Sequence, residues 1–151
     1  MNPIIIKELM TDFASEVYET IEGKHPRFLI EEWQDKIRMS DKFFANTLNP
    51  NETVLVATWA NIEGLSVEDF CAKIAAEALS YANLRMNLSV LYNTSLQQVL
   101  SATPEALAPS LMGIIGRAQE AMVAFANGDE KLQEELLNLL ADMTAGIQDN
   151  L

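Results

Sequence analysis

The segment 66–100 constrains the fold more than any other part of the chain, because its second half carries no charge. No Asp, Glu, Lys or Arg occurs within 86–104, and Glu105 is then the only charged residue before Arg117. The chain as a whole is strongly acidic, with a net charge of −12. We therefore expect a long helix that is covered on most sides, either by the chain's own bundle or by a second subunit.

Composition favours helix along the whole chain. Gly (6) and Pro (5) are scarce among the 151 residues, and the hydrophobic share of 49% is that of a folded globular domain. Apolar residues recur at helical spacing, and no fixed-period repeat or low-complexity linker interrupts them. We predict an all-α fold, a single-domain helical bundle over 1–151 with about five to seven helices and a long central helix.

The first helix is the best defined. Asn2 and Pro3 form a start signal and Gly23 a stop signal, so the pattern predicts a helix over Pro3–Glu22. One apolar stripe at spacings of three and four runs along it, formed by Ile6, Met10, Phe13, Val17 and Ile21. A second start follows at His25-Pro26, and periodicity leaves open whether 26–48 is one bent helix or two.

The segment 49–64 begins with the helix-start pattern Asn-Pro-Asn-Glu, although the run Val54–Trp59 is rich in β-branched residues and resembles a strand. A lone strand has nothing to pair with, so we predict a helix that ends at Gly64. Its apolar side is predicted to contain Leu55, Trp59 and Ile62.

The central helix starts at Ser66, which precedes acidic residues in a capping arrangement. If this helix is unbroken to Leu100, it is about 50 Å long. If it is interrupted, the expected break is at 93–95 (Asn-Thr-Ser). An apolar stripe is formed by Phe70, Ile74, Ala78, Tyr81, Leu88, Tyr92, Leu96 and Val99. A stripe of mostly small residues beside it, Cys71, Ala75, Ala78, Ala82 and Met86, is expected to let another helix approach closely.

Two more helices are predicted after the central one. The first starts at Pro104, with Pro109 placed to kink it, and Gly113 and Gly116 are expected to let helices pack closely. Its apolar side is formed by Leu111, Ile114, Ile115, Ala118, Met122 and Phe125. The last helix is capped by Asp129, repeats apolar residues at near-heptad spacing, and is expected to fray from Gly146 onward.

The negative charge makes some classes of function improbable on physical grounds. An acidic field repels phosphate backbones and anionic lipid head groups, so we expect no direct nucleic-acid binding and no membrane attachment. No run of about 18 apolar residues and no signal-peptide pattern occurs, and a cytoplasmic, soluble protein is expected. The charge is compatible with simple solubility and also with attraction to a basic partner.

Candidate chemical groups are few. His25 is the only histidine and Cys71 the only cysteine; we interpret the first as a solvated loop residue and the second as a buried apolar residue. Carboxylate groups such as 31–35 and 130–135 lie beside Lys and Arg residues, which is typical of solvated helix faces with local ion pairs. We therefore expect no enzyme activity, no cofactor and no metal site.

The sequence thus favours a non-enzymatic, acidic protein-interaction module, such as an adaptor, inhibitor or assembly factor. Its uncharged region 81–116 is expected to bind a second copy, giving a homo-oligomer such as a dimer, or a basic protein partner. The predicted interface residues are Tyr81, Met86, Leu88, Tyr92, Leu96, Met112 and Ile115. The same pattern also fits an intrachain core. The alternative function is a bundle that encloses a small apolar ligand, lined by Met86, Met112, Met122, Met143 and the Phe residues.

Overall fold

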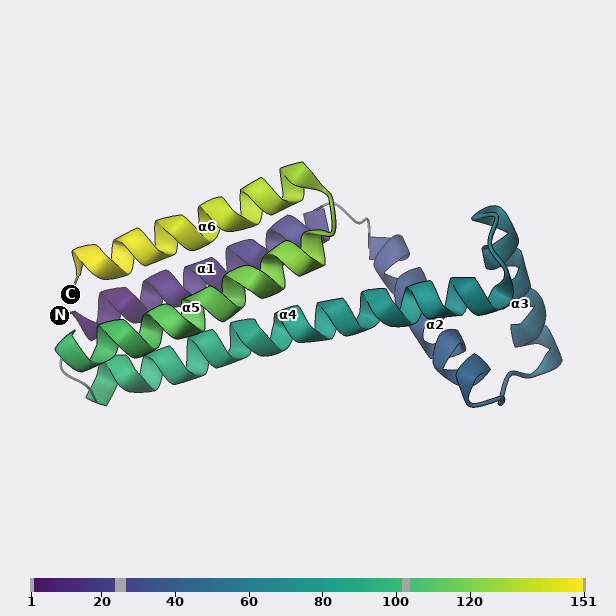
Figure 1. The fold of residues 1–151 in the computed structure, drawn as a ribbon, viewed down its shortest axis with the longest axis horizontal. Helices are drawn as coiled ribbons and strands as arrows, with labels where there is room; N and C mark the ends of the chain where they lie inside the picture. The colour runs from purple at the N-terminus through teal and green to yellow at the C-terminus, as the bar shows by residue number, and fades with distance from the viewer. Residues whose placement is uncertain (1, 24–26, 102–103, 151) are drawn as a thin grey trace. The chain divides into compact units, whose positions relative to one another are not determined.

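The computed structural model describes residues 2–23, 27–101 and 104–150, except for the side chains of 3, 27–29, 94–96, 98–101 and 104–110. These residues form six α-helices and no strand, as the all-α prediction requires. The helices are α1 (Pro3–Gly23), α2 (Arg27–Phe44), α3 (Pro50–Ile62), α4 (Val67–Ser101), α5 (Pro104–Ala126) and α6 (Glu130–Asp149) (Figure 1).

The chain divides into two compact units. Unit 1 comprises Met1–Lys24 and Ala82–Leu151, and unit 2 comprises His25–Tyr81. Helix α4 contributes its first half to unit 2 and its second half to unit 1. The single-domain expectation for 1–151 stays a prediction.

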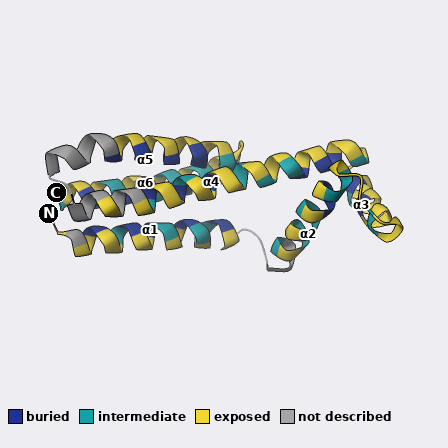
Figure 2. Cartoon of the chain, turned by 90° about the horizontal axis from the view of Figure 1, so that it is seen from below, coloured by how far each residue is buried: buried dark blue, intermediate teal, exposed yellow. Residues whose placement is uncertain are grey.

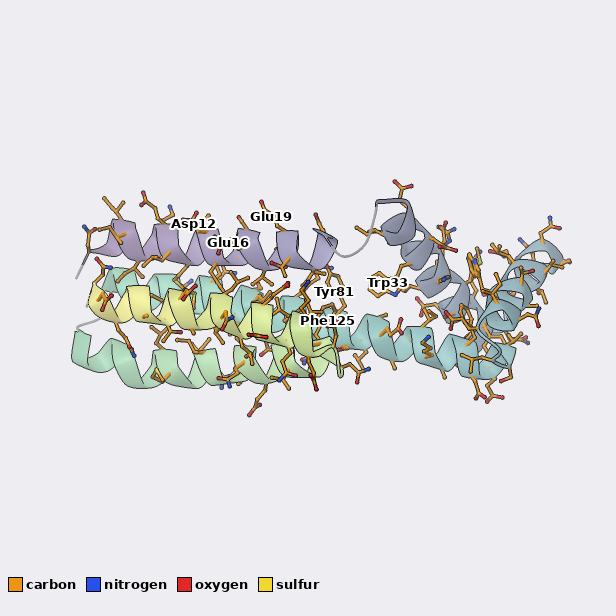
Figure 3. The ribbon with its side chains drawn as sticks, turned by 90° about the horizontal axis from the view of Figure 1, so that it is seen from above. Asp12, Glu16, Glu19, Trp33, Tyr81 and Phe125 are labelled. Carbon is orange, nitrogen blue, oxygen red and sulfur yellow. The ribbon has the colours of Figure 1, made fainter. Side chains whose placement is uncertain are left out.

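Unit 1 is a helical bundle in which α1, α5, α6 and the second half of α4 lie side by side (Figure 1). The apolar stripe predicted for α1 is buried along its whole length, and its acidic residues face outward, including Asp12, Glu16 and Glu19 (Figure 3). Helix α6 supplies the opposite side of the core. Its buried residues are Leu132, Leu136, Leu140, Met143 and Ile147. The amphipathic patterns of α1 and α6 are therefore confirmed.

Gly146 lies within α6 rather than at a frayed end, which corrects the expectation from sequence. Helix α6 continues to Asp149. A Cβ atom built on Gly146 would lie 3.1 Å from both δ carbons of Leu9. The Leu9 side chain of α1 therefore packs where a side chain at position 146 would begin. The pattern suggested a helix end because glycine is a poor helix former, whereas here it permits close packing.

Unit 2 packs α2, α3 and the first half of α4 around a smaller core. Its buried members are Met39, Val56, Ala60, Phe70, Cys71 and Ile74. The Trp33 ring meets the Tyr81 ring edge-on, with centroids 5.5 Å apart (Figure 3). The Trp59 ring lies 6.4 Å from that of Phe70. The sequence alone leaves open whether 26–48 forms one helix or two. The structure has a single helix there, α2, which ends at Phe44.

Helix α4 has no break at 93–95, which corrects the predicted interruption. The side chain of Asn93 donates from Nδ2 to the backbone oxygen of Ser89, 2.9 Å away, and so bonds to its own helix. The Asn87 side chain does the same to the Asn83 oxygen at 2.9 Å. Asn side chains can compete with the helix for backbone hydrogen bonds. Here both donate to a backbone oxygen four residues earlier, so the helix is not interrupted.

Candidate interaction surfaces

The predicted interface residues separate into buried and exposed groups. Leu88 and Ile115 are core residues of unit 1, only 4% and 6% exposed, and so offer no surface to a partner. Met86 and Met112 lie outside, 57% and 53% exposed. We predicted one surface from these residues, but the bundle buries two of them and leaves the other two exposed.

The two tyrosines are half-buried within the chain, and the last predicted residue is not described. Tyr81 contacts Trp33 in unit 2. The Tyr92 hydroxyl lies 3.4 Å from the Thr11 hydroxyl, so it joins α4 to α1 in unit 1. The side chain of Leu96, like His25, lies outside the described residues. Of the predicted interface residues whose side chains the structure describes, only Met86 and Met112 are therefore exposed.

The outward side of α4 in unit 1 forms a regular stripe, which we call the α4 face. Its members are all exposed and follow one another at spacings of three and four residues: Asn83, Met86, Val90, Asn93 and Gln97. This heptad spacing is the one by which two helices pack along a shared seam. We did not predict this face, because the predicted apolar stripe of the helix runs through Leu88, which the bundle buries.

Carboxylates are absent from the α4 face and from the helix around it. Between Glu77 and Glu105 the only ionisable side chains are Arg85, Tyr81 and Tyr92, so this part of an acidic chain contains no carboxylate. The amides of Asn87 and Asn93 are already bonded to the helix. A partner that covers this face would therefore leave few buried polar groups without a hydrogen bond.

Gly113 and Gly116 lie on the exposed side of α5, beside Met112. We expected these glycines to let helices pack closely. No described helix of this chain does so, because a Cβ atom on either glycine would meet nothing within 4 Å. The small residues that α5 buries are instead Ala118, Ala121 and Ala126.

Helix α3 carries a second exposed apolar surface, which includes Leu55 and Ile62 from the apolar side predicted for this helix. The buried residues are Val56 and Ala60, with Trp59 half-buried, whereas Leu55 and Ile62 are 40% and 76% exposed. Figure 2 shows most of α3 in the colour of exposed residues. Apolar residues occur all round this helix, so spacing alone does not define which side is buried.

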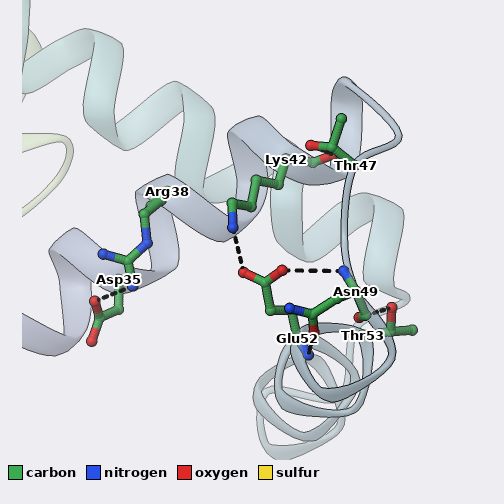
Figure 4. A network of polar contacts seen from close by, with 7 residues as sticks. All are labelled: Asp35, Arg38, Lys42, Thr47, Asn49, Glu52 and Thr53. Carbon is green, nitrogen blue, oxygen red and sulfur yellow. Dashed lines mark hydrogen bonds and ion pairs between the residues drawn. The ribbon is translucent and has the colours of Figure 1, made fainter.

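Polar contacts fix both ends of α3, and Figure 4 shows those at its first turn. Asn49 and Glu52 form the predicted capping box, with Glu52 N 2.8 Å from Asn49 Oδ1 and Asn49 N 3.1 Å from Glu52 Oε1. Lys42 Nζ lies 2.6 Å from Glu52 Oε2. These bonds hold the pKa of the Glu52 carboxyl below its usual value of 4.5, and the bond from Lys42 has the largest effect. At the other end, Lys73 Nζ lies 3.0 Å from Glu63 Oε2.

Cys71 is fully buried in unit 2, which confirms its interpretation as a buried apolar residue. Burial raises the pKa of its thiol, and the neighbouring Ser40 hydroxyl offsets part of that rise. The Ser40 hydroxyl is itself buried without a hydrogen bond of ordinary geometry. A thiol is a weak hydrogen-bond partner, and a buried thiol with a raised pKa is a poor nucleophile.

The carboxylates of α2 form the predicted local ion pairs. Arg38 lies 2.9 Å from Asp35, and Lys36 lies 3.9 Å from Glu32. The Lys36 ammonium also lies 5.6 Å from the centre of the Trp59 ring. Within the described residues, no three His, Cys, Asp or Glu side chains are grouped closely enough to hold a metal ion.

Two hollows in the described parts of the chain, one in each unit, are smaller than a usual small-molecule site. The cavity in unit 1 lined by Met10, Phe13, Leu88 and Met143, among others, measures about 10 Å³, which is room for about one water molecule. An open groove in unit 2 lined by Phe43, Asn46, Leu48, Thr53 and Val67 measures about 230 Å³. Small-molecule sites usually measure roughly 300 to 1,000 Å³.

None of the described helices is both long enough and apolar enough to cross a membrane. The chain matches no protein-family model, and it has no significant similarity to a curated protein or to a solved structure.

Proposed function

We propose that this chain is a non-enzymatic protein-interaction module that self-associates through the α4 face. The observation that carries the proposal is an exposed heptad stripe free of carboxylates in a chain of net charge −12. An acidic protein meets the least repulsion from its own copy where acidic side chains are absent. Met86 and Val90 supply the apolar centre, and the asparagines before and after them supply uncharged polar positions.

The expected complex is a dimer in which the second half of α4 pairs with its counterpart. Seams at spacings of three and four interlock side chains of two helices, and an Asn within such a seam favours one register. Interfaces lose charge at their centre while keeping Met and uncharged polar residues, which is the composition of this face.

The alternative, a bundle that encloses a small apolar ligand, draws no support from the methionines proposed to line it. Met122 and Met143 are buried in the core, whereas Met86 and Met112 face outward. The four residues therefore do not surround one space, and the cavity beside Met143 has room for about one water molecule.

Sedimentation velocity at micromolar concentrations tests the proposal. We expect the wild-type chain to shift from monomer toward dimer as its concentration rises. Replacing both Met86 and Val90 by Glu should abolish the shift, because each introduces a charge at the centre of the seam. Ile62→Glu is the matched control, since it introduces the same kind of charge at another exposed apolar position, 76% exposed, and should leave the dimer intact.

A wild-type chain that stays monomeric throughout that range contradicts the proposal. A dimer that resists the double change but dissociates with Ile62→Glu would move the self-association to α3. Far-UV circular dichroism of each variant shows that the helices remain, so loss of the dimer is not loss of the fold.

A further inference from the structure

The outward side of α3, formed by Val54, Leu55, Thr58 and Ile62, is a second exposed apolar surface, which we call the α3 face. Val54 and Ile62 are 66% and 76% exposed, and Leu55 is 40% exposed. A helix that is apolar on all sides is normally buried on all sides. In unit 2 only the side with Val56 and Ala60 is buried, so half of this apolar helix is in contact with solvent.

Two threonine hydroxyls of α3 already donate hydrogen bonds to the backbone of the helix. Thr58 Oγ1 donates to the backbone oxygen of Val54 at 2.8 Å, and Thr53 Oγ1 donates to that of Asn49 at 2.9 Å. A partner that covers the α3 face therefore does not strip these hydroxyls of their bonds. Burial of a polar group costs little when its hydrogen bond is already made.

The α3 face is also held rigidly before any partner arrives. The capping box and Lys42 fix the first turn, and the pair Glu63–Lys73 fixes the residue that follows the last turn. The inner side of the helix is anchored by Val56 and Ala60 in the core. A surface that is already ordered loses little conformational entropy on binding.

The charges around the α3 face select the kind of partner. The basic residues nearest in sequence to the two ends of α3 are Lys42 and Lys73. Both already form ion pairs, with Glu52 and Glu63 respectively. Three exposed carboxylates lie in the flanking turns of α2 and α4 and have no ion pair in the described part of the chain: Asp41, Glu68 and Asp69. Along the chain, the helix that carries the α3 face is thus preceded and followed by carboxylates without an ion pair.

We propose that the α3 face docks an amphipathic helix of another protein, whose apolar stripe is bordered by Lys or Arg. The stripe covers the apolar residues, and the basic side chains approach the flanking carboxylates. A second copy of this chain would bring the same carboxylates to the same border and would be repelled. The α3 face shares no residue with the α4 face, so this proposal does not depend on self-association.

The size of the face sets the expected strength. Helix α3 has 13 residues and is therefore about 20 Å long. A single helix of that length covers less than the roughly 800 Å² per partner of a stable complex, so a transient complex is expected, with a Kd on the order of micromolar.

Fluorescence anisotropy of a labelled model peptide, titrated with the full chain, tests the proposal. The probe is an amphipathic peptide with Leu at positions i, i+3, i+4 and i+7 and Lys elsewhere. We expect Ile62→Glu and Val54→Glu each to weaken binding about tenfold or more, because each charge lies at the centre of the contact. Met86→Glu, on the α4 face, is the charge-matched control and should change Kd less than about twofold.

A peptide of the same composition but scrambled order keeps the charge and loses the apolar stripe, and it should bind at least about tenfold more weakly. Equal binding of the scrambled peptide, or equal weakening by Met86→Glu, would mean simple charge attraction and would overturn the proposal. Self-association of the wild-type chain that is lost with Ile62→Glu would overturn it as well, because a second copy would then occupy the α3 face. Since Val54 and Ile62 are exposed, both variants should keep the wild-type far-UV spectrum and melting temperature, which separates lost binding from lost folding.

Discussion

Leu88 and Met86 are two residues apart on α4 and lie on opposite sides of it, so replacing each by Ala separates core from surface within the uncharged region. Leu88 is 4% exposed, and Leu88→Ala removes three buried carbon atoms. At about 0.8 kcal/mol for each, with a further cost for the cavity left behind, the free energy of unfolding should fall by about 3 kcal/mol. Met86 is 57% exposed, and Met86→Ala should change it by about 0.5 kcal/mol or less.

Urea denaturation followed by far-UV circular dichroism measures both changes, and the melting temperature of Leu88→Ala should fall by about 6 to 12 °C. Trp33 and Trp59, the two tryptophans of the chain, both belong to unit 2, so their fluorescence reports on that unit, whereas circular dichroism reports on all the helices. A loss below about 1 kcal/mol for Leu88→Ala, or equal losses for the two variants, would refute the placement of Leu88 in the core.

Three further predictions follow from local geometry. Gly113→Ala and Gly116→Ala should each raise the free energy of unfolding by about 0.5 to 1 kcal/mol, because a Cβ meets open space at an exposed helical position; thermal melts that show destabilisation would contradict this. The lowered pKa of Glu52 gives stability that is present above pH 4.5 and lost as the pH falls through the folded-state pKa. Urea midpoints of wild type and Glu52→Gln should therefore differ most near neutral pH and converge in acid, and a gap independent of pH would contradict the charge-based account. The Cys71 thiol should react with a thiol reagent only on unfolding, since it is buried with a raised pKa, and rapid labelling of the native chain would show otherwise.

The amphipathic helices were predictable from sequence because charged and apolar residues alternate at helical spacing. On α1 the residues Ile6 to Ile21 alternate with acidic ones, and this contrast identified the buried side correctly. Helix starts were equally accessible, because the capping side chains act locally. Asp129 Oδ1 accepts from Leu132 N at 3.0 Å, and Ser66 Oγ accepts from Asp69 N at 3.1 Å.

The candidate surfaces were not predictable in the same way, because the helices that carry them lack that contrast. Along α3 and the second half of α4 nearly every residue is apolar or uncharged, so several stripes fit equally well and only packing selects one. The expectation therefore named Leu88, which is core, and passed over Val90, which is exposed. A second scarcity of charge, with Glu52 the only charged residue within 43–62, was the signal that could have indicated the α3 face.

The central claim is that the exposed, carboxylate-free stripe on α4 joins two copies of the chain. Sedimentation velocity of the wild type beside the variant with Glu at positions 86 and 90 measures this most directly. The account predicts a concentration-dependent shift of the 16.8-kDa chain toward twice that mass in the wild type and none in the variant. A wild type that stays at the monomer mass, or a variant that dimerises as readily, would contradict it.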